Sequence, residues 1–137
     1  MLEIPLLLYG ATGRMGVAVR SLLPEFPEVA LLACVAPDRD DRPCREGCVW
    51  LRPEELPLGH GLAALPPDLG VVDVSLAAGT ARLVEVLERM PRRLIAATTG
   101  LDDAMEVRIR DLGRRSGVLR ARNLSLGNAV SQALLRA

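Results

Sequence analysis

The sequence predicts an α/β fold: a doubly wound parallel sheet in a single domain that covers residues 1–137. Three observations support this prediction. Short apolar runs alternate with segments of helical periodicity along most of the chain. A glycine-rich turn, residues 10–16, joins the first apolar run to the first helical segment. Half of the 137 residues are hydrophobic, which is enough to build one core and argues against disorder.

The first part of the sheet is expected to consist of two strands separated by one helix. Ile4–Tyr9 is an apolar run that predicts the first strand. The helix is expected over residues 13–23, and Pro24 ends it because proline cannot continue the hydrogen-bond ladder. The unbroken apolar run 29–35 predicts a second strand that is covered on both faces.

Residues 36–68 carry the weakest pattern. The charged stretch 36–43 is bounded by proline and predicts a loop. A short strand is expected at 49–51 and one helical turn at 53–56. Glycine and proline interrupt the remainder, for which we predict irregular structure.

Regular alternation returns at Gly70. The predicted elements are strand 71–75, helix 79–90, strand 94–98, a helix from a cap at Asp102 or Asp103 to about Ser116 with Gly117 as its stop, strand 118–121 and a final helix 126–136. Strands that alternate with helices form right-handed parallel crossovers. We therefore expect a parallel sheet with helices on both faces.

The turn at residues 10–16 follows a strand and opens a helix, as in a dinucleotide-binding, Rossmann-like domain. In this interpretation Gly10 lets the chain turn, Gly13 lets the backbone approach a pyrophosphate, and Gly16 packs the helix tightly on the strand. The first N–H groups of the helix would face the phosphates, and Arg14 would add a full positive charge. The alternative is a tight turn that binds nothing.

A dinucleotide fold brings the adenosine ribose to the end of its second strand. Asp38 suits a 2′-hydroxyl and Arg39 suits a 2′-phosphate, so the choice between NAD and NADP stays open; the alternative is a solvated charge cluster. Turns rich in small polar residues end other predicted strands, at 75–80, 97–100 and 121–125. Because these turns share one edge of the sheet, they predict a ligand site rather than a set of unrelated helix caps.

Composition argues against several functions. The formal net charge is zero, so we expect binding neither to nucleic acid nor to an anionic membrane surface. All 17 basic residues are arginine, which excludes a lysine Schiff base or a P-loop lysine from this chain. No apolar run is long enough to cross a bilayer. We expect a cytoplasmic protein.

The three cysteines are odd in number, and no signal peptide precedes them, which favours a reducing compartment. Cys44 and Cys48 have the spacing of half a metal site, and His60, the only histidine, lies further along the chain. We expect no metal here, and interpret these residues as loop thiols and a surface imidazole.

Four segments match, in order and spacing, the motifs of one enzyme family. They are Gly10-Ala-Thr-Gly-Arg-Met-Gly16, Val71-Val-Asp-Val-Ser75 with Gly79-Thr80, Ala97-Thr-Thr-Gly-Leu101, and Asn123-Leu-Ser-Leu-Gly127. Together they resemble the amino-terminal, NAD(P)-binding domain of 4-hydroxy-tetrahydrodipicolinate (dihydrodipicolinate) reductase, an oxidoreductase of lysine biosynthesis. The resemblance implies contacts at the turn after the first strand, and at a threonine turn and an asparagine turn near the nicotinamide. With the residues argued above, the candidate cofactor contacts are Gly10, Ala11, Thr12, Gly13, Arg14, Met15, Asp38, Arg39, Ser75, Ala97, Thr98, Thr99, Ala121, Arg122, Asn123 and Leu124.

The sequence departs from the family pattern in three respects. Family members continue into a second domain with a His-His…Lys catalytic stretch and an Ala-Pro-Ser-Gly-Thr substrate loop, and neither occurs in this sequence. Ala36 stands where the family has an acidic residue at the end of the second strand. Leu76 replaces a family arginine, which removes an expected cofactor contact. No catalytic residue is therefore assigned.

Three hypotheses follow from this pattern. The chain is an NAD(P)(H)-binding domain without the catalytic half of the family; or it is an active oxidoreductase completed by a separate catalytic subunit; or it is a vestigial structural or interaction module that no longer binds nucleotide. The final predicted helix carries an apolar stripe that either faces the sheet or is partly exposed and pairs with a second copy. We expect a homodimer. The stripe consists of Leu126, Ala129, Val130, Ala133 and Leu134.

Overall fold

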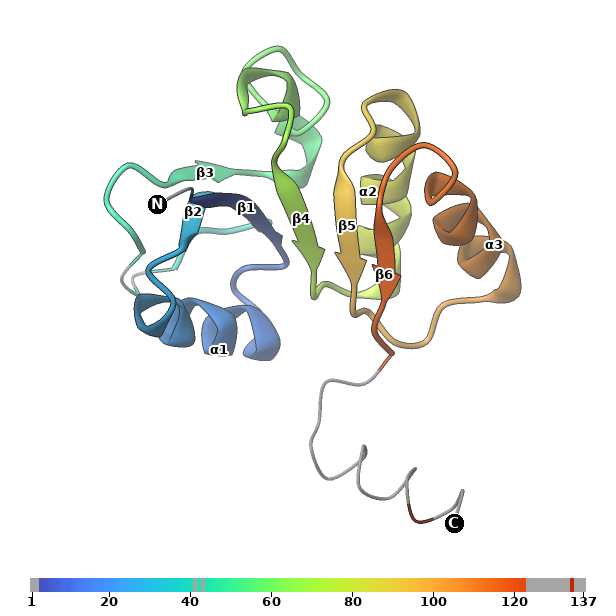
Figure 1. The fold of residues 1–137 in the computed structure, drawn as a ribbon, viewed down its shortest axis with the longest axis horizontal. Helices are drawn as coiled ribbons and strands as arrows, with labels where there is room; N and C mark the ends of the chain where they lie inside the picture. The colour runs from blue at the N-terminus through green and yellow to red at the C-terminus, as the bar shows by residue number, and fades with distance from the viewer. Residues whose placement is uncertain (1–2, 41, 43, 123–133, 135–137) are drawn as a thin grey trace.

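The computed structural model describes residues 3–40, 42, 44–122 and 134. It contains a six-stranded sheet in the order β3-β2-β1-β4-β5-β6, and every neighbouring pair of strands is parallel (Figure 1). The strands are β1 (Ile4–Tyr9), β2 (Val29–Val35), β3 (Val49–Leu51), β4 (Gly70–Asp73), β5 (Arg93–Ala96) and β6 (Val118–Arg120). The helices are α1 (Arg14–Leu22), α2 (Ala77–Arg89) and α3 (Asp103–Leu112), with 3₁₀ turns η1 (Leu23–Glu25), η2 (Pro53–Glu55) and η3 (Leu62–Ala64). The predicted Rossmann-like, doubly wound α/β fold is confirmed.

Helices pack on both faces of the sheet, because successive strand residues point to opposite sides. Leu7 and Tyr9 of β1 belong to a core that also contains Val84 of α2 and Ile109 of α3. Leu8, between them, belongs to a second core on the α1 face. The central strands are thus buried on both sides, which explains their unbroken apolar runs.

The segment between β3 and β4 completes the larger core without a full helix. Leu56, Leu62 and Leu69 are each at most 1 % exposed and pack against the α2 face. The short strand at 49–51 and the helical turn that begins at Pro53 are confirmed. Among the described residues, no helix combines the length and the apolar composition needed to cross a membrane.

Several predicted boundaries are wrong by one or two residues. α1 begins at Arg14, because Gly13 is its extended N-cap. β4 ends at Asp73 rather than at Ser75, because the Asp73 carboxylate accepts the N–H of Ser75 at 3.0 Å and turns the chain away from the sheet. α2 begins at Ala77, two residues before the predicted start at Gly79. β5 and β6 also end early, two residues and one residue before their predicted ends.

The predicted end of α3 is wrong by four residues. The helix stops at Leu112 with Gly113 as its C-cap, because the N–H of Gly113 bonds to the carbonyl of Arg110 at 3.0 Å and tightens the last turn. The predicted cap at Asp102 is confirmed, since its carboxylate accepts the N–H of Met105 at 2.8 Å. The predicted final helix, 126–136, and the homodimer expected through it lie outside the described residues, apart from position 134.

The strand order reverses direction between β1 and β4. The chain proceeds outward through β2 and β3 on one side, and through β5 and β6 on the other. In open α/β sheets, ligands bind outside the carboxyl ends of the strands at this switch point. The turns after Tyr9 and Asp73 therefore mark the place for a ligand.

Candidate functional site

A tight corner follows β1 at the switch point. Gly10 has a φ of +89°, and a Cβ there would lie 2.8 Å from the backbone of Ser75. A Cβ on Gly16 would lie 2.2 Å from the carbonyl oxygen of Gly10. Both glycines are thus required by the protein's own packing, although Gly16 packs α1 against the turn rather than against the strand.

Gly13, between them, is not required by packing. Its φ of −73° and ψ of 174° form an extended conformation that any residue adopts. A Cβ there would meet only the carbonyl oxygen of Gly10, at 3.6 Å, which is an ordinary contact. The protein itself leaves the space in front of Gly13 open.

A cavity of about 620 Å³ lies beside this corner. Its size falls within the range of small-molecule sites, roughly 300–1,000 Å³. Ala11 of the predicted set does not line it, because the residue is fully buried beneath the turn. The lining residues are Tyr9, Gly10, Thr12, Gly13, Arg14, Met15, Val35, Ala36, Pro37, Pro53, Val74, Ser75, Leu76, Ala78, Gly79 and Arg82.

Two helices begin at this cavity with uncapped N-termini. Neither α1 nor α2 has a side-chain cap or an acidic residue in its first turn. α3, which does not border the cavity, is capped by Asp102 and carries Asp103 and Glu106 in its first turn. The first N–H groups of α1 and α2 and their positive dipole ends are therefore available to an anion.

Two guanidinium groups add positive charge to the same lining. Arg14 stands at the first position of α1, and Arg82 lies one turn into α2. Neither forms an ion pair or a side-chain hydrogen bond with another residue that the structure describes. Arg82 was missed by the sequence analysis; it supplies a cation on the α2 side of the cavity.

Tyr9 presents a buried hydroxyl to this region. The residue is 2 % exposed and lines the cavity, yet its hydroxyl has no hydrogen-bond partner among the described residues. Burial, followed by the negative charge of Asp73, raises the pKa of Tyr9 to about 12. Tyr9 thus borders the cavity, while its hydroxyl is a buried donor that lacks a partner among the described residues.

We expect Tyr9→Phe to leave the unliganded protein as stable as the wild type, or more stable by about 1 kcal/mol, because it removes a buried donor without a partner. The unfolded chain ionises near the ordinary pKa of 10.0, below the folded value of about 12, so the wild type loses stability as pH rises between these values. By pH 11 this loss amounts to about 1.4 kcal/mol, which the variant should lack. Urea unfolding at pH 7 and pH 11 measures both effects; a variant clearly less stable at pH 7 would contradict the assignment.

Comparison with known proteins identifies the family that this geometry belongs to. A family model described as "Dihydrodipicolinate reductase, N-terminus" matches residues 4–124. The chain belongs to the dihydrodipicolinate reductase family. The matched part is the family's amino-terminal domain, as the resemblance of the four motifs predicted.

Curated relatives agree with this assignment. The 4-hydroxy-tetrahydrodipicolinate reductase of Xanthomonas euvesicatoria pv. vesicatoria (strain 85-10) is 28% identical over 127 residues, which are 93% of this chain and 51% of the relative. The enzyme of the same name from Xylella fastidiosa (strain 9a5c) is 31% identical over 125 residues, 91% of this chain and 50% of the relative. That of Nitratidesulfovibrio vulgaris (strain DP4) is 27% identical over 127 residues, which are 92% of this chain and 47% of the relative. The chain spans about half the length of the curated relatives it matches.

The reductase-family motif at the end of β4 is organised by a buried carboxylate. Asp73 is fully buried and accepts hydrogen bonds from the hydroxyls of Ser75 and Thr80, each at 2.6 Å. This holds the turn after β4 against the first turn of α2. Ser75 therefore lines the cavity with its side chain directed to Asp73, and Asp73 is a positioning residue that sequence analysis missed.

The threonine turn lies at the same edge of the sheet but not in the cavity lining. The N–H of Ala97 bonds to the carbonyl of Asp73 at 2.9 Å. Thr98 is 3 % exposed, and its hydroxyl donates to the carbonyl of Ser75 at 3.2 Å. Thr99 is exposed. The structure thus connects this turn to the cavity through Ser75 and leaves Thr99 accessible beside it.

Arg120, at the end of β6, holds the threonine turn through hydrogen bonds to its backbone. Its guanidinium donates to the carbonyls of Ala96 at 2.8 Å and Thr98 at 2.6 Å, and pairs with Glu106 of α3 at 2.9 Å. The neighbouring candidate Arg122 is exposed and lies 3.9 Å from the same carboxylate.

The backbone of Ala121 bonds to Ala96, so this candidate continues the sheet edge. Asn123 and Leu124 lie outside the described residues.

We expect Arg120→Met to lower the free energy of unfolding by about 2 kcal/mol, because two carbonyls and a carboxylate lose a charged donor together. Arg120 holds the pKa of Glu106 below its usual range, so the interaction contributes stability above that range and loses it as pH falls. Urea unfolding at pH 7 and pH 3 tests this. Arg122→Gln, on the exposed side of the same carboxylate, is the control and should cost less than about 0.5 kcal/mol.

Asp38 and Arg39 are exposed and do not line the cavity beside the Gly10 corner. They border a hollow of about 310 Å³ that shares Ala36 and Pro37 with it. The guanidinium of Arg39 lies 5.9 Å from the centre of the Trp50 ring, a cation–π contact that sequence analysis missed. Both candidates thus lie next to the cavity, at the end of β2 as predicted.

Another hollow, of about 690 Å³, lies beside the second half of α1. Its lining includes Phe26 and Val29, the first residue of β2. It therefore opens at the amino end of the strand, the edge opposite to the one where ligands of such sheets bind.

Proposed function

We propose that the chain binds NADH or NADPH as the nucleotide-binding domain of a dihydrodipicolinate reductase. The observation that carries this proposal is the contrast among the three glycines. Gly10 and Gly16 are required by the fold, whereas Gly13 is not and faces an open cavity. A bound pyrophosphate explains why this position is a glycine, whereas packing within the protein does not.

The charges around the cavity support the same ligand. A pyrophosphate carries negative charge, and the lining offers two uncapped helix N-termini with Arg14 and Arg82. The adenosine would extend toward Ala36 and the neighbouring hollow. There Asp38 would accept a hydrogen bond from a 2′-hydroxyl, or Arg39 would bind a 2′-phosphate. In this arrangement the turn that contains Ser75 borders the nicotinamide half.

The cofactor supplies the hydride of a reductase reaction, and this chain's residues bind and orient it. The proton for the substrate must come from a group near neutral pKa. The chain contains no lysine, and His60 is exposed and paired with Glu55 at 3.2 Å, away from the cavity lining. We therefore propose that the substrate-binding and proton-donating groups belong to another segment or chain.

Thermal unfolding with and without cofactor tests the proposal. Ligand at a hundred times its dissociation constant stabilises the folded state by about 2.7 kcal/mol. In a domain of this size, that corresponds to a rise of roughly 5–10 °C in Tm. NADH and NADPH are each compared with adenosine, which lacks the pyrophosphate. A Tm that neither dinucleotide changes at millimolar concentration would contradict the proposed function.

A further inference from the structure

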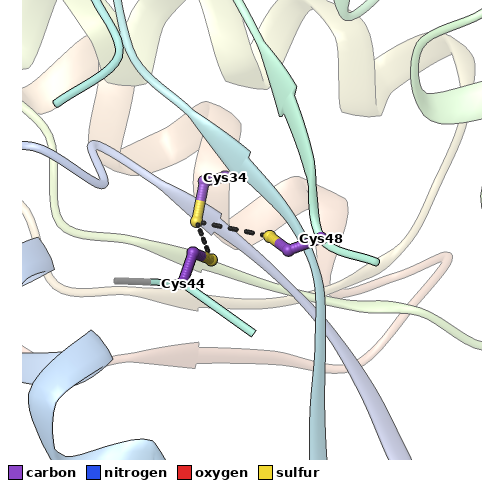
Figure 2. A group of neighbouring side chains, drawn as sticks. All are labelled: Cys34, Cys44 and Cys48. Carbon is purple, nitrogen blue, oxygen red and sulfur yellow. Dashed lines mark hydrogen bonds between the residues drawn. The ribbon is translucent and has the colours of Figure 1, made fainter. Parts of the chain in front are cut away.

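The three cysteines meet at one point on the α1 face of the sheet (Figure 2). Cys34 is the next-to-last residue of β2, Cys44 lies in the following loop, and Cys48 immediately precedes β3. The sulfur of Cys34 lies 3.6 Å from that of Cys44 and 3.7 Å from that of Cys48, and all three lie within 4.8 Å of one another. The predicted half-site of Cys44 and Cys48 lacked Cys34, which only the fold adds.

The separations match those of sulfurs that share a metal ion. Two sulfurs of a tetrahedral zinc site, with Zn–S bonds of about 2.3 Å, lie about 3.8 Å apart. All three cysteines are free thiols, and a disulfide would join only two of them. Three sulfurs at nearly ligand spacing, brought together from three places in the chain, indicate a site rather than a chance pair.

The surroundings suit three thiolates around a divalent ion. Cys34 is fully buried at the floor of the group, and Cys44 and Cys48 are half-buried toward a polar hollow of about 590 Å³. Three thiolates and Zn²⁺ carry one net negative charge. The hollow is lined by three arginines and two carboxylates, a formal net charge of +1 that offsets it: Arg39, Arg42, Arg45, Asp40 and Glu46.

We propose that Cys34, Cys44 and Cys48 bind one Zn²⁺ ion through their three thiolates, with a solvent molecule in the fourth position. Among the described residues, no histidine nitrogen or carboxylate oxygen belongs to the group, so the fourth position opens toward the hollow. Thiolates are soft ligands that select zinc over magnesium or calcium.

The ion would connect elements that the sheet alone joins weakly. β3 contains three residues and is one of the two edge strands; within the part of the chain that the structure describes, it pairs only with β2. Zinc binding would fix the loop after β2, which carries Asp38 and Arg39, to the strand that precedes it. The inference does not depend on nucleotide binding, because none of the three cysteines lines the nucleotide cavity.

Metal titration of the reduced, chelator-treated chain tests the proposal. We expect one equivalent of Zn²⁺ to bind and to raise Tm, with Mg²⁺ at the same concentration causing no change. One equivalent of Co²⁺ should produce the near-ultraviolet thiolate-to-metal charge-transfer band and the intense visible bands of a tetrahedral site. Absence of these bands, or saturation at half an equivalent, would overturn the assignment.

Serine variants at each cysteine identify the ligands. Loss of a group behind a ligand typically weakens metal binding by 10–100-fold, so loss of a ligand itself should weaken it by about a hundredfold or more. Cys44 and Cys48 are half-buried, so we expect Cys44→Ser and Cys48→Ser to fold, and circular dichroism checks this. If Cys34→Ser does not fold, the Co²⁺ spectrum of the wild type still tests the site. His60→Ala removes the only imidazole of the chain, which does not belong to the cysteine group. This variant should bind zinc as the wild type does. Wild-type affinity in Cys44→Ser or Cys48→Ser would refute the proposed ligand set.

Discussion

Gly13→Ala is expected to weaken dinucleotide binding by about ten- to hundredfold, or roughly 1.4–2.7 kcal/mol, while the fold keeps its stability. The added methyl group meets only the Gly10 carbonyl oxygen within the protein, at 3.6 Å, and the backbone is already in an extended conformation. It does occupy the space through which a pyrophosphate approaches the first amides of α1. Calorimetric titration with NADPH measures the affinity, and urea unfolding measures the stability.

Gly16→Ala provides the matched comparison, because it adds the same methyl group three residues later. There the methyl carbon would lie 2.2 Å from the Gly10 oxygen and 2.7 Å from the backbone of Ala11, so the start of α1 must move. We expect a loss of about 3 kcal/mol in stability, consistent with overpacking against backbone. If Gly13→Ala bound NADPH as tightly as the wild type, the corner would not hold a pyrophosphate.

Asp40→Asn is expected to lower the free energy of unfolding by about 3 kcal/mol, because it leaves a buried guanidinium without its counter-charge. The side chain of Arg20 is 3 % exposed, and both of its terminal nitrogens bond to the Asp40 carboxylate, one of them at 3.0 Å. The guanidinium also lies 5.2 Å from the centre of the Trp50 ring. The pair joins α1 to the loop after β2, so its loss loosens the edge of the sheet.

The same pair predicts a pH dependence. The hydrogen bond from Arg20 holds the pKa of Asp40 below its ordinary value of 3.8, so the pair stabilises the fold above that pH and is lost on further acidification. The difference between wild type and Asp40→Asn should therefore be full at pH 7 and should shrink below about pH 4. Glu85→Gln, which breaks an exposed pair with Arg89, is the control and should cost less than about 0.5 kcal/mol. A loss of that small size in Asp40→Asn would show that the pair does not hold the loop.

Sequence pattern predicted the strands well, because buried parallel strands are continuous apolar runs. Both β1 and β2 have the predicted bounds. Helix ends were predicted less well, because the sequence offers more than one stop signal and the folded structure decides between them. α3 stops at Leu112 with Gly113 as its C-cap, although the prediction placed the stop at the second glycine, Gly117.

The candidate site was predicted where glycine spacing records a backbone requirement, and missed where distant side chains meet. Gly10 makes the predicted turn, and Gly16 allows a close approach of α1, although to the turn rather than to the strand. Arg120 and Cys34 lie in strands, and their partners are at least 10 residues away, so their neighbours in sequence do not reveal them. Asp73 is different, because its hydroxyl-bearing partners belong to the motif already recognised in the sequence. The partners of Arg120, on β5 and α3, are 14 to 24 residues away along the chain. Only the fold brings such groups together.

A crystal structure of the chain soaked with NADPH tests the central claim most directly. We expect a phosphate oxygen within about 3.2 Å of the main-chain nitrogen of Arg14 or Met15, at the start of α1. No side chain should lie between the phosphate and Gly13. Dinucleotide bound in the hollow that contains Phe26, or a corner that stays closed to phosphate at saturating NADPH, would contradict it.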